Sequence, residues 1–62
     1  MDENKLVMLK ANVRRMEYIT IPDIKGQYNV NDKEAQELLD KLIQCGLVQP
    51  FPVDGMHFKV NR

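Results

Sequence analysis

The hydrophobic period of this chain changes at Gly46, and this change constrains the fold more than any other feature. Before it, apolar residues recur at the spacing of a helix with one buried face. These residues are Ala35, Leu38, Leu39, Leu42 and Ile43. Asn31 is a favourable N-cap, and Glu34 is placed to bond back to the cap backbone. Gly46 favours a left-handed cap, so we predict a helix over about residues 31–45, with Leu47 packing back onto its last turn.

The residues after this glycine follow the two-residue period of a β-strand. Apolar Met56, Phe58 and Val60 alternate with polar His57 and Lys59, which predicts a half-buried strand with its polar residues outward. Asp54-Gly55 favours a tight turn, so we expect a hairpin over about residues 47–60. Pro50 and Pro52 have no amide proton to donate, so the first strand is expected at an edge or as an irregular segment.

The first half of the chain predicts two further helices. The first, over about residues 5–17, has one apolar stripe, formed by Leu6, Leu9, Val13 and Met16. Lys10, Arg14 and Arg15 fall off this stripe and are expected on a solvated face. Tyr18-Ile19-Thr20 then favours a brief strand or an isolated β-bridge.

The second helix is expected over about residues 21–28. Thr20 and Asp23 have the spacing of a capping box, and Pro22 falls in the first turn, where a missing amide proton costs nothing. Ile24 and Tyr28 are expected to face inward.

The bulk composition bounds the class of protein. Sixty-two residues make one domain, expected over residues 1–62, and such a short chain rarely shelters a substrate pocket. We therefore expect no enzyme, catalytic residue, cofactor, metal site or small-molecule substrate. Nine basic and nine acidic residues cancel, whereas DNA-binding domains are usually basic. No apolar run is long enough to span a membrane, so no membrane partner is expected.

Cys45 is the only cysteine, which excludes an intramolecular disulfide and a cysteine-rich zinc site. A reducing intracellular compartment, nuclear or cytoplasmic, is the simpler expectation. Cys45 lies at the end of a predicted helix, where the helix dipole disfavours a thiolate, so we expect an inert, packed thiol. His57, the only histidine, is expected to be a half-exposed surface residue.

The order of predicted elements is helix, short strand, helix, helix and a terminal hairpin, which is an α+β fold. At Ile24, Leu38-Leu39-Leu42 and Gly46-Leu47-Val48 the sequence resembles the winged helix-turn-helix superfamily, over nearly the whole chain. The resemblance implies a small winged helix, with three helices plus a two- to three-stranded β-wing. It also implies a binding module.

Two members of this superfamily look closest. The γ domain of the bacterial FtsK DNA translocase is similar at Gly46-Leu47-Val48-Gln49-Pro50 and at Gly55, and it reads DNA from its third helix. The C-terminal winged helix of the middle subunit of replication protein A is similar at Ile21-Pro22-Asp23-Ile24-Lys25 and His57-Phe58-Lys59, and it docks helical peptides of repair proteins. These resemblances imply a DNA-maintenance or chromosome-associated protein, in replication or repair.

Under the first resemblance, the third helix and the wing bind a DNA duplex weakly and mostly without sequence specificity. Lysine can contact guanine or phosphate, and glutamine can pair with adenine. The expected DNA contacts are Lys25, Lys33, Gln36, Lys41, His57, Lys59 and Arg62. The third helix also carries acidic residues, among them Glu34 and Glu37, where the FtsK family favours Asn and Arg. Capping and pairing with Lys33 and Lys41 are expected to account for these acids.

The alternative is a protein-docking winged helix that receives a basic helical peptide or a partner domain without contacting DNA. The expected docking residues are Glu34, Glu37, Phe51 and Val53. Phe51 is more simply explained as a core residue, but if it is exposed beside Val53 it marks a contact patch.

Overall fold

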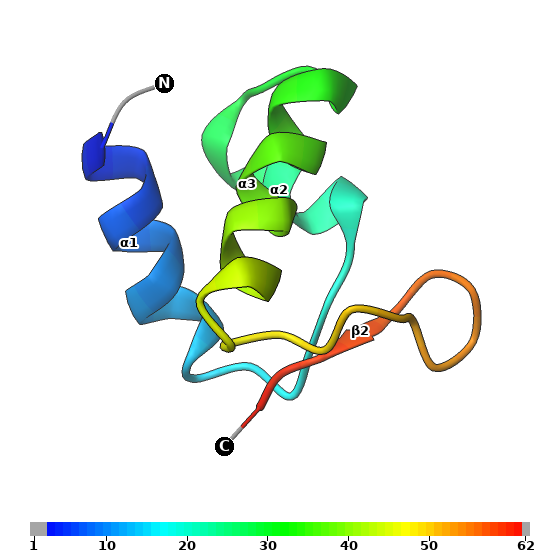
Figure 1. Cartoon of the computed structure of the whole chain (residues 1–62). Coiled ribbons are helices and arrows are strands. Elements are labelled where there is room, and N and C mark those ends of the chain that lie inside the picture. Colours follow the sequence, from blue (N-terminus) through cyan, green and yellow to red (C-terminus); the bar gives the residue numbers. More distant parts are fainter. Residues whose placement is uncertain (1–2, 62) are drawn as a thin grey trace.

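Five elements follow one another in the order helix, strand, helix, helix, strand (Figure 1). The structure is a computed structural model that describes residues 3–61, without the side chain of Glu3. The elements are α1 (Glu3–Val13), β1 (Tyr18–Ile19), α2 (Ile21–Tyr28), α3 (Asp32–Gln44) and β2 (Phe58–Lys59). Three helices with a two-stranded antiparallel sheet form an α+β fold, as the sequence predicts.

The helix α3 begins and ends where the capping signals predict. The Asn31 side chain accepts a hydrogen bond from the Glu34 amide at 2.8 Å. Gly46 takes a φ of +81°, and the Leu47 amide donates to the Leu42 carbonyl at 3.0 Å. These bonds satisfy backbone groups that a helix end leaves without partners. The inward stripe is confirmed, because Ala35, Leu38, Leu39 and Leu42 are buried.

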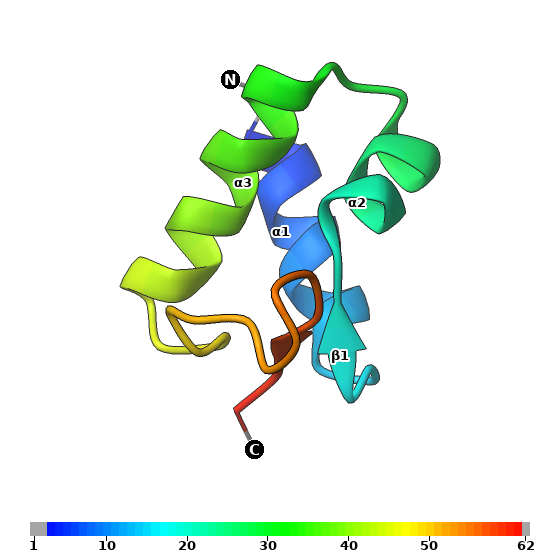
Figure 2. The ribbon, with the colours of Figure 1, turned by 90° about the vertical axis from the view of Figure 1, so that its right-hand side faces the viewer.

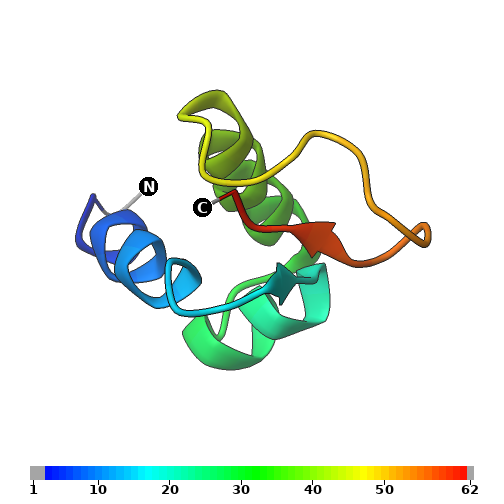
Figure 3. The ribbon, with the colours of Figure 1, turned by 90° about the horizontal axis from the view of Figure 1, so that it is seen from below.

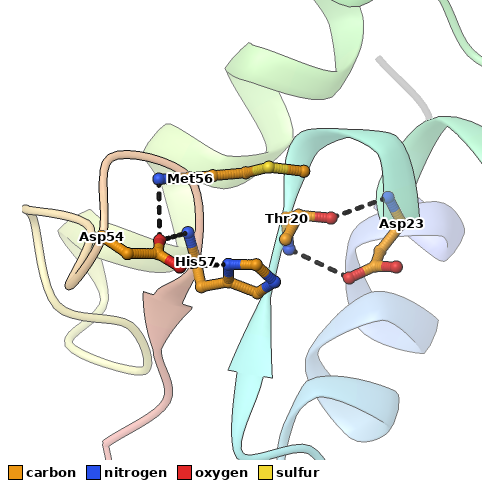
Figure 4. Close-up of polar contacts among 5 residues, drawn as sticks. All are labelled: Thr20, Asp23, Asp54, Met56 and His57. Carbon is orange, nitrogen blue, oxygen red and sulfur yellow. Dashed lines mark hydrogen bonds and ion pairs between the residues drawn. The ribbon is translucent and has the colours of Figure 1, made fainter.

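The helix α2 is fixed by the predicted capping box (Figure 4). The Thr20 hydroxyl accepts a hydrogen bond from the Asp23 amide at 3.2 Å, and the Thr20 amide donates to the Asp23 carboxylate at 3.1 Å. Thr20 is buried, and these bonds satisfy it there. Ile24 is buried in the core, while Asn29 ends the helix in the left-handed conformation with φ 51°.

The helix α1 is shorter at its C-terminal end than the apolar stripe predicts. It ends at Val13, and the chain turns there because the amides of Arg15 and Met16 donate to carbonyls three residues earlier, at 3.1 Å and 2.9 Å. Arg14 and Arg15 therefore lie just beyond the helix, exposed as expected. Met16 still packs against the core from the turn, which explains why its spacing resembles helix.

The sheet pairs two segments that lie far apart in the sequence. β1 and β2 are antiparallel, with Tyr18 opposite Lys59 and Ile19 opposite Phe58. Val48 adds an isolated antiparallel bridge to Val60 on the other side of β2. Figure 3 shows β1 and β2 side by side. The sheet thus ties the end of the chain to the segment before α2.

Only part of the predicted 47–60 hairpin forms as a ladder. The Gln49 amide bonds to the Lys59 carbonyl at 3.0 Å, and the Val53 amide bonds to the His57 carbonyl at 2.9 Å. Residues 50–57, named here the tip loop, hold no β-strand. Pro50 and Pro52 supply no amide protons to a ladder, which accounts for the irregular path. The turn is found where Asp54-Gly55 predicts it, with φ +88° at Gly55.

One hydrophobic core joins all five elements. Its buried members are Leu9, Val13, Ile19, Ile24, Val30, Ala35, Leu38, Leu39, Leu42, Val48 and Val60. Polar contacts also join α1 to the other helices: Asn12 Nδ2 donates to the Tyr28 hydroxyl at 2.7 Å, and Lys5 forms an ion pair with Glu34 at 3.5 Å. None of the helices within residues 3–61 combines the length and the apolar character needed to cross a membrane.

Candidate binding surfaces

The outward face of α3 carries three of the residues predicted to contact DNA. Lys33, Gln36 and Lys41 are all exposed on it. Glu37 and Asp40 are exposed on the same face, at the helical spacing that interleaves them with the lysines. Two lysines and two acids give this face no net charge, so it offers a phosphate backbone little attraction.

Several predicted DNA contacts already have partners within the chain. Lys25 Nζ lies 2.7 Å from Asp32 Oδ1, and His57 Nδ1 lies 2.8 Å from Asp54 Oδ2. Gln36 Nε2 donates to Asp40 Oδ1 at 3.0 Å along α3. Each of these groups would give up an existing contact to bind a nucleotide.

Two further predicted contacts are placed differently. Lys59 is exposed on β2, opposite Tyr18, and lies on another element from the α3 lysines. Arg62 lies outside the described residues. Lys33, Lys41 and Lys59 form no ion pair with any residue in the described part of the chain. They are the cations of the predicted set that remain for a ligand.

The predicted pairing of the α3 acids with Lys33 and Lys41 is wrong. Glu34 is paired with Lys5 of α1 at 3.5 Å, and it does not reach back to the cap backbone. Asp32 is paired with Lys25, and Asp40 is bonded to Gln36. Glu37 remains exposed, and no ion pair forms on it within residues 3–61. Glu37 is therefore the freer of the two predicted docking acids.

The tip loop exposes a cluster of large apolar side chains. Phe51 is 79% exposed, Val53 59% and Met56 50%. The simpler explanation of Phe51, as a core residue, is wrong, and Met56 does not continue the inward alternation of Phe58 and Val60. The exposed Phe51 beside an exposed Val53 is the arrangement that marks a contact patch. Figure 1 shows this loop (orange) projecting to the right beyond α2 and α3, and in Figure 2 it faces the viewer.

The Asp54 carboxylate organises the tip loop (Figure 4). Asp54 Oδ1 accepts hydrogen bonds from the amides of Met56 at 3.0 Å and His57 at 2.8 Å, while Oδ2 contacts the His57 ring. The His57 and Met56 amides, followed by the His57 side chain, lower the pKa of Asp54 below its ordinary 3.8. The His57 ring also meets Tyr18 of β1 edge-on, with ring centroids 6.4 Å apart. The apolar side chains thus stand on an ordered loop.

A second apolar surface lies on α1, where the sequence interpretation expected solvated charge. Val7 is 64% exposed and Met8 60%. Ala11, one helical turn after Val7, is exposed as well. The sequence signal for this second face is that Val7, Met8 and Ala11 are apolar but lie outside the inward stripe of α1.

The structure also bears on catalytic and metal chemistry. Cys45 is exposed, so the predicted packed thiol is wrong, although its thiol donates to the Leu42 carbonyl at 3.3 Å. Among residues 3–61, no group of three or more His, Cys, Asp or Glu side chains is placed to hold a metal ion. His57 is half-exposed, as predicted, and its close partner is the carboxylate of the turn.

Comparison with known protein families, with curated proteins and with solved structures gives no match to this chain. The fold, the outward face of α3 and the tip loop therefore carry the functional inference.

Proposed function

We propose that this chain is a non-enzymatic binding module of the winged-helix type that docks a protein partner through its tip loop. The order of helices supports this assignment, as does the pairing of the final strand with β1. In this proposal the wing is the tip loop, which lies between the bridge at Val48 and the strand β2. We further propose that the module belongs to an intracellular DNA-maintenance or chromosome-associated protein, nuclear or cytoplasmic, where the exposed Cys45 thiol stays reduced.

The exposure of Phe51 carries this proposal. A large aromatic side chain that is 79% exposed gains hydrophobic free energy only when something covers it. Val53 and Met56 of the same loop are also at least half exposed, so the loop exposes more apolar surface than a single side chain. Exposed aromatic residues of this kind often supply most of the free energy of protein association.

The Asp54 bonds make the patch better suited to binding. They hold the loop before a partner arrives, so association loses less conformational entropy. On α3, the exposed Glu37 forms no ion pair within residues 3–61, so it can pair with a basic side chain of a partner. The occupant that fits both surfaces is an amphipathic helix with apolar anchors and lysines or arginines beside them.

A synthetic peptide library tests this proposal directly. The library fixes apolar residues at helical spacing, places Lys and Arg between them, and is selected on the immobilised wild-type chain. We expect a family of binders whose affinity falls at least about tenfold when Phe51→Ala replaces the wild type. Amide shifts on binding should cluster in the tip loop and on the outward face of α3.

The matched control is Met8→Ala, which shortens an exposed apolar side chain on α1 and should leave peptide affinity unchanged. Both positions are more than half exposed, so neither change should alter the fold, which circular dichroism verifies. Binders that ignore Phe51→Ala, or a library that yields none, would overturn the docking proposal.

Binding of a DNA duplex is the second candidate, and one observation favours it. Lys33 and Lys41 share the exposed face of α3, and neither forms an ion pair within residues 3–61. The start of the third helix is also the part of a helix-turn-helix that enters the major groove. The neutral charge of that face ranks this candidate below docking.

A further inference from the structure

A small open pocket lies where the tip loop meets the sheet. Its volume is about 300 Å³, and the described residues that line it are Tyr18, Val53, Asp54 and His57. Tyr18 belongs to β1, whereas the other three belong to the tip loop. Val53 is also one of the exposed apolar residues of that loop. A partner that covers the apolar side chains of the loop therefore lies next to this pocket.

Backbone and ring contacts hold the walls of the pocket in place. The Val53 amide donates to the His57 carbonyl at 2.9 Å across the loop. The His57 ring meets the Tyr18 ring edge-on, with centroids 6.4 Å apart, and Figure 4 shows the His57 ring turned toward β1 and Thr20. The pocket is thus formed before a ligand arrives, so binding has to order few groups.

The Asp54 carboxylate gives the pocket a negative charge and an open acceptor position. Asp54 Oδ1 already accepts two amide protons, while Oδ2 contacts the His57 ring. A carboxylate oxygen can accept two hydrogen bonds, so Oδ2 has room for a second donor. The Asp54 side chain is 54% exposed, which leaves this oxygen accessible. The lowered pKa of Asp54 keeps the carboxylate ionised at neutral pH.

No lysine or arginine within residues 3–61 lines this pocket. Asp54 also forms no ion pair with a lysine or arginine in that part of the chain. Lys59 lies opposite Tyr18 in the sheet, but it lines a different hollow, with Glu17 and Gln49. When the His57 ring is neutral, the pocket therefore holds an uncompensated negative charge beside an aromatic side chain.

This lining favours a guanidinium group over an ammonium group. Tyr18 is 38% exposed, and an edge-on His57 ring covers at most one of the two faces of the Tyr18 ring. A planar guanidinium can stack on the other face while one of its N–H groups donates to Asp54 Oδ2. An ammonium group can pair with the carboxylate, but it is more strongly hydrated and has no flat face to stack.

We propose that the pocket between β1 and the tip loop binds an arginine side chain of the docked partner, stacked on Tyr18 and paired with Asp54. The inference rests on the proposed function, because the docked partner supplies the arginine. It deepens that function by fixing where one basic residue of the partner lies. The partner should carry this arginine beside the apolar side chains that cover the tip loop.

A free arginine derivative tests the pocket without any docked peptide. N-acetyl-L-arginine amide is titrated to millimolar concentration into the nitrogen-15-labelled chain at about pH 8, where histidine is generally neutral. We expect saturable amide shifts at Tyr18, Asp54 and His57. The lysine derivative, which has the same charge, and the citrulline derivative, which has nearly the same shape, should bind at least about threefold more weakly. Equal shifts with all three derivatives, or none with arginine, overturn the proposal.

Variants of the two walls test which groups hold the arginine. Tyr18→Leu removes the aromatic face, whereas the conservative Tyr18→Phe keeps it. Asp54→Asn removes the charge, while its amide oxygen can still accept the Met56 and His57 amide protons. We expect Tyr18→Leu and Asp54→Asn to weaken the arginine derivative at least about threefold and Tyr18→Phe to retain it. Circular dichroism verifies the fold of each variant. If Tyr18→Phe loses as much affinity as Tyr18→Leu, the arginine does not stack on the ring.

The peptides selected from the library separate this inference from docking itself. In a peptide that binds the wild-type chain, each arginine is replaced in turn by citrulline. One replacement should lower affinity for the wild type about fivefold, but less than about twofold for Tyr18→Leu. Peptides that require Phe51 but tolerate every citrulline leave the docking proposal standing and overturn the arginine pocket. Saturable shifts with the arginine derivative, when the library yields no binder, support the arginine pocket and overturn docking through Phe51.

Discussion

Asp54 is the residue on which the shape of the tip loop most depends. One carboxylate accepts two backbone amide protons and contacts the His57 ring, across a turn that Gly55 makes with positive φ. Charge-assisted hydrogen bonds of this kind are stronger than neutral ones. The apolar side chains of the loop give it little other support, since Phe51, Val53 and Met56 are all at least half exposed. The turn at Asp54-Gly55 therefore holds in place the loop that carries the exposed apolar side chains.

The titration of Asp54 follows from these contacts. Its folded-state pKa lies below 3.8, so the ionised carboxylate contributes to loop order above that pH, and the contribution is lost as the pH falls through the lower value. Carbon-13 NMR of the carboxyl should give a midpoint below 3.8, and the Met56 amide shift should follow it. His57→Gln should leave most of the lowering, because the backbone amides are its largest cause. A midpoint at or above 3.8 in the wild type contradicts this explanation.

The sequence predicted the position of this turn but not what its side chains do. The turn at Asp54-Gly55 is predicted from two adjacent residues, and its conformation depends little on the rest of the chain. The exposure of Phe51 depends instead on how residues 50–57 fold, and they form no strand. The strand β2 pairs with β1, about forty residues earlier in the chain, and no local pattern around Phe51 contains this information.

At the scale of elements, two glycines in the helical part of the chain should respond to substitution in opposite directions. Gly46 has φ +81°, a conformation in which an L side chain is strained, so Gly46→Ala should destabilise the fold by about 1–2 kcal/mol. Gly26 lies inside α2, and an added Cβ would meet no atom within 4 Å, so Gly26→Ala should stabilise by about 0.5–1 kcal/mol. Urea unfolding followed by circular dichroism measures both changes. If both shift stability in the same direction, the assigned helix end at Gly46 is wrong.

The accuracy of the element predictions follows the range of the interactions that fix each element. The helices α2 and α3 are bounded by cap residues a few positions away, and their predicted bounds are close to those found. The predicted end of α1 lies too far along the chain because Met16 has the spacing of an inward helical residue. In the structure Met16 packs against the core from a turn after the helix. The irregular path predicted from Pro50 and Pro52 is found, whereas the alternation of Met56, Phe58 and Val60 predicted a longer strand than the two residues of β2.

At the scale of the whole molecule, size and charge limit what the chain can do with DNA. Its longest dimension is 27 Å, which spans about eight base pairs at 3.4 Å each. The formal net charge is zero. Of the predicted DNA contacts, Lys33, Lys41 and Lys59 are the described cations without an internal ion pair, and Arg62 can add one more. A duplex complex at the predicted surface therefore rests on about four phosphate contacts at most.

These limits set a numerical expectation for DNA binding. With three to four phosphates neutralised, the logarithm of the affinity should fall against the logarithm of salt concentration with a slope of about −3 to −4. Affinity should be weaker than about 0.1 mM near physiological salt. Fluorescence anisotropy of a short labelled duplex at 20–200 mM salt measures both quantities (a range of about one decade). Lys33→Glu with Lys59→Glu should abolish the binding seen at low salt.

The control for this experiment changes net charge by the same amount on another element. Arg14→Glu with Arg15→Glu also replaces two cations by two anions, but beyond the end of α1. If the outward face of α3 and β2 form the DNA surface, this variant keeps more of the low-salt affinity than the lysine variant. An equal loss of affinity in both variants means that binding depends only on the net charge of the chain. A slope steeper than about −6 requires more cations than this surface holds, and it would move the phosphate contacts to a different face of the molecule.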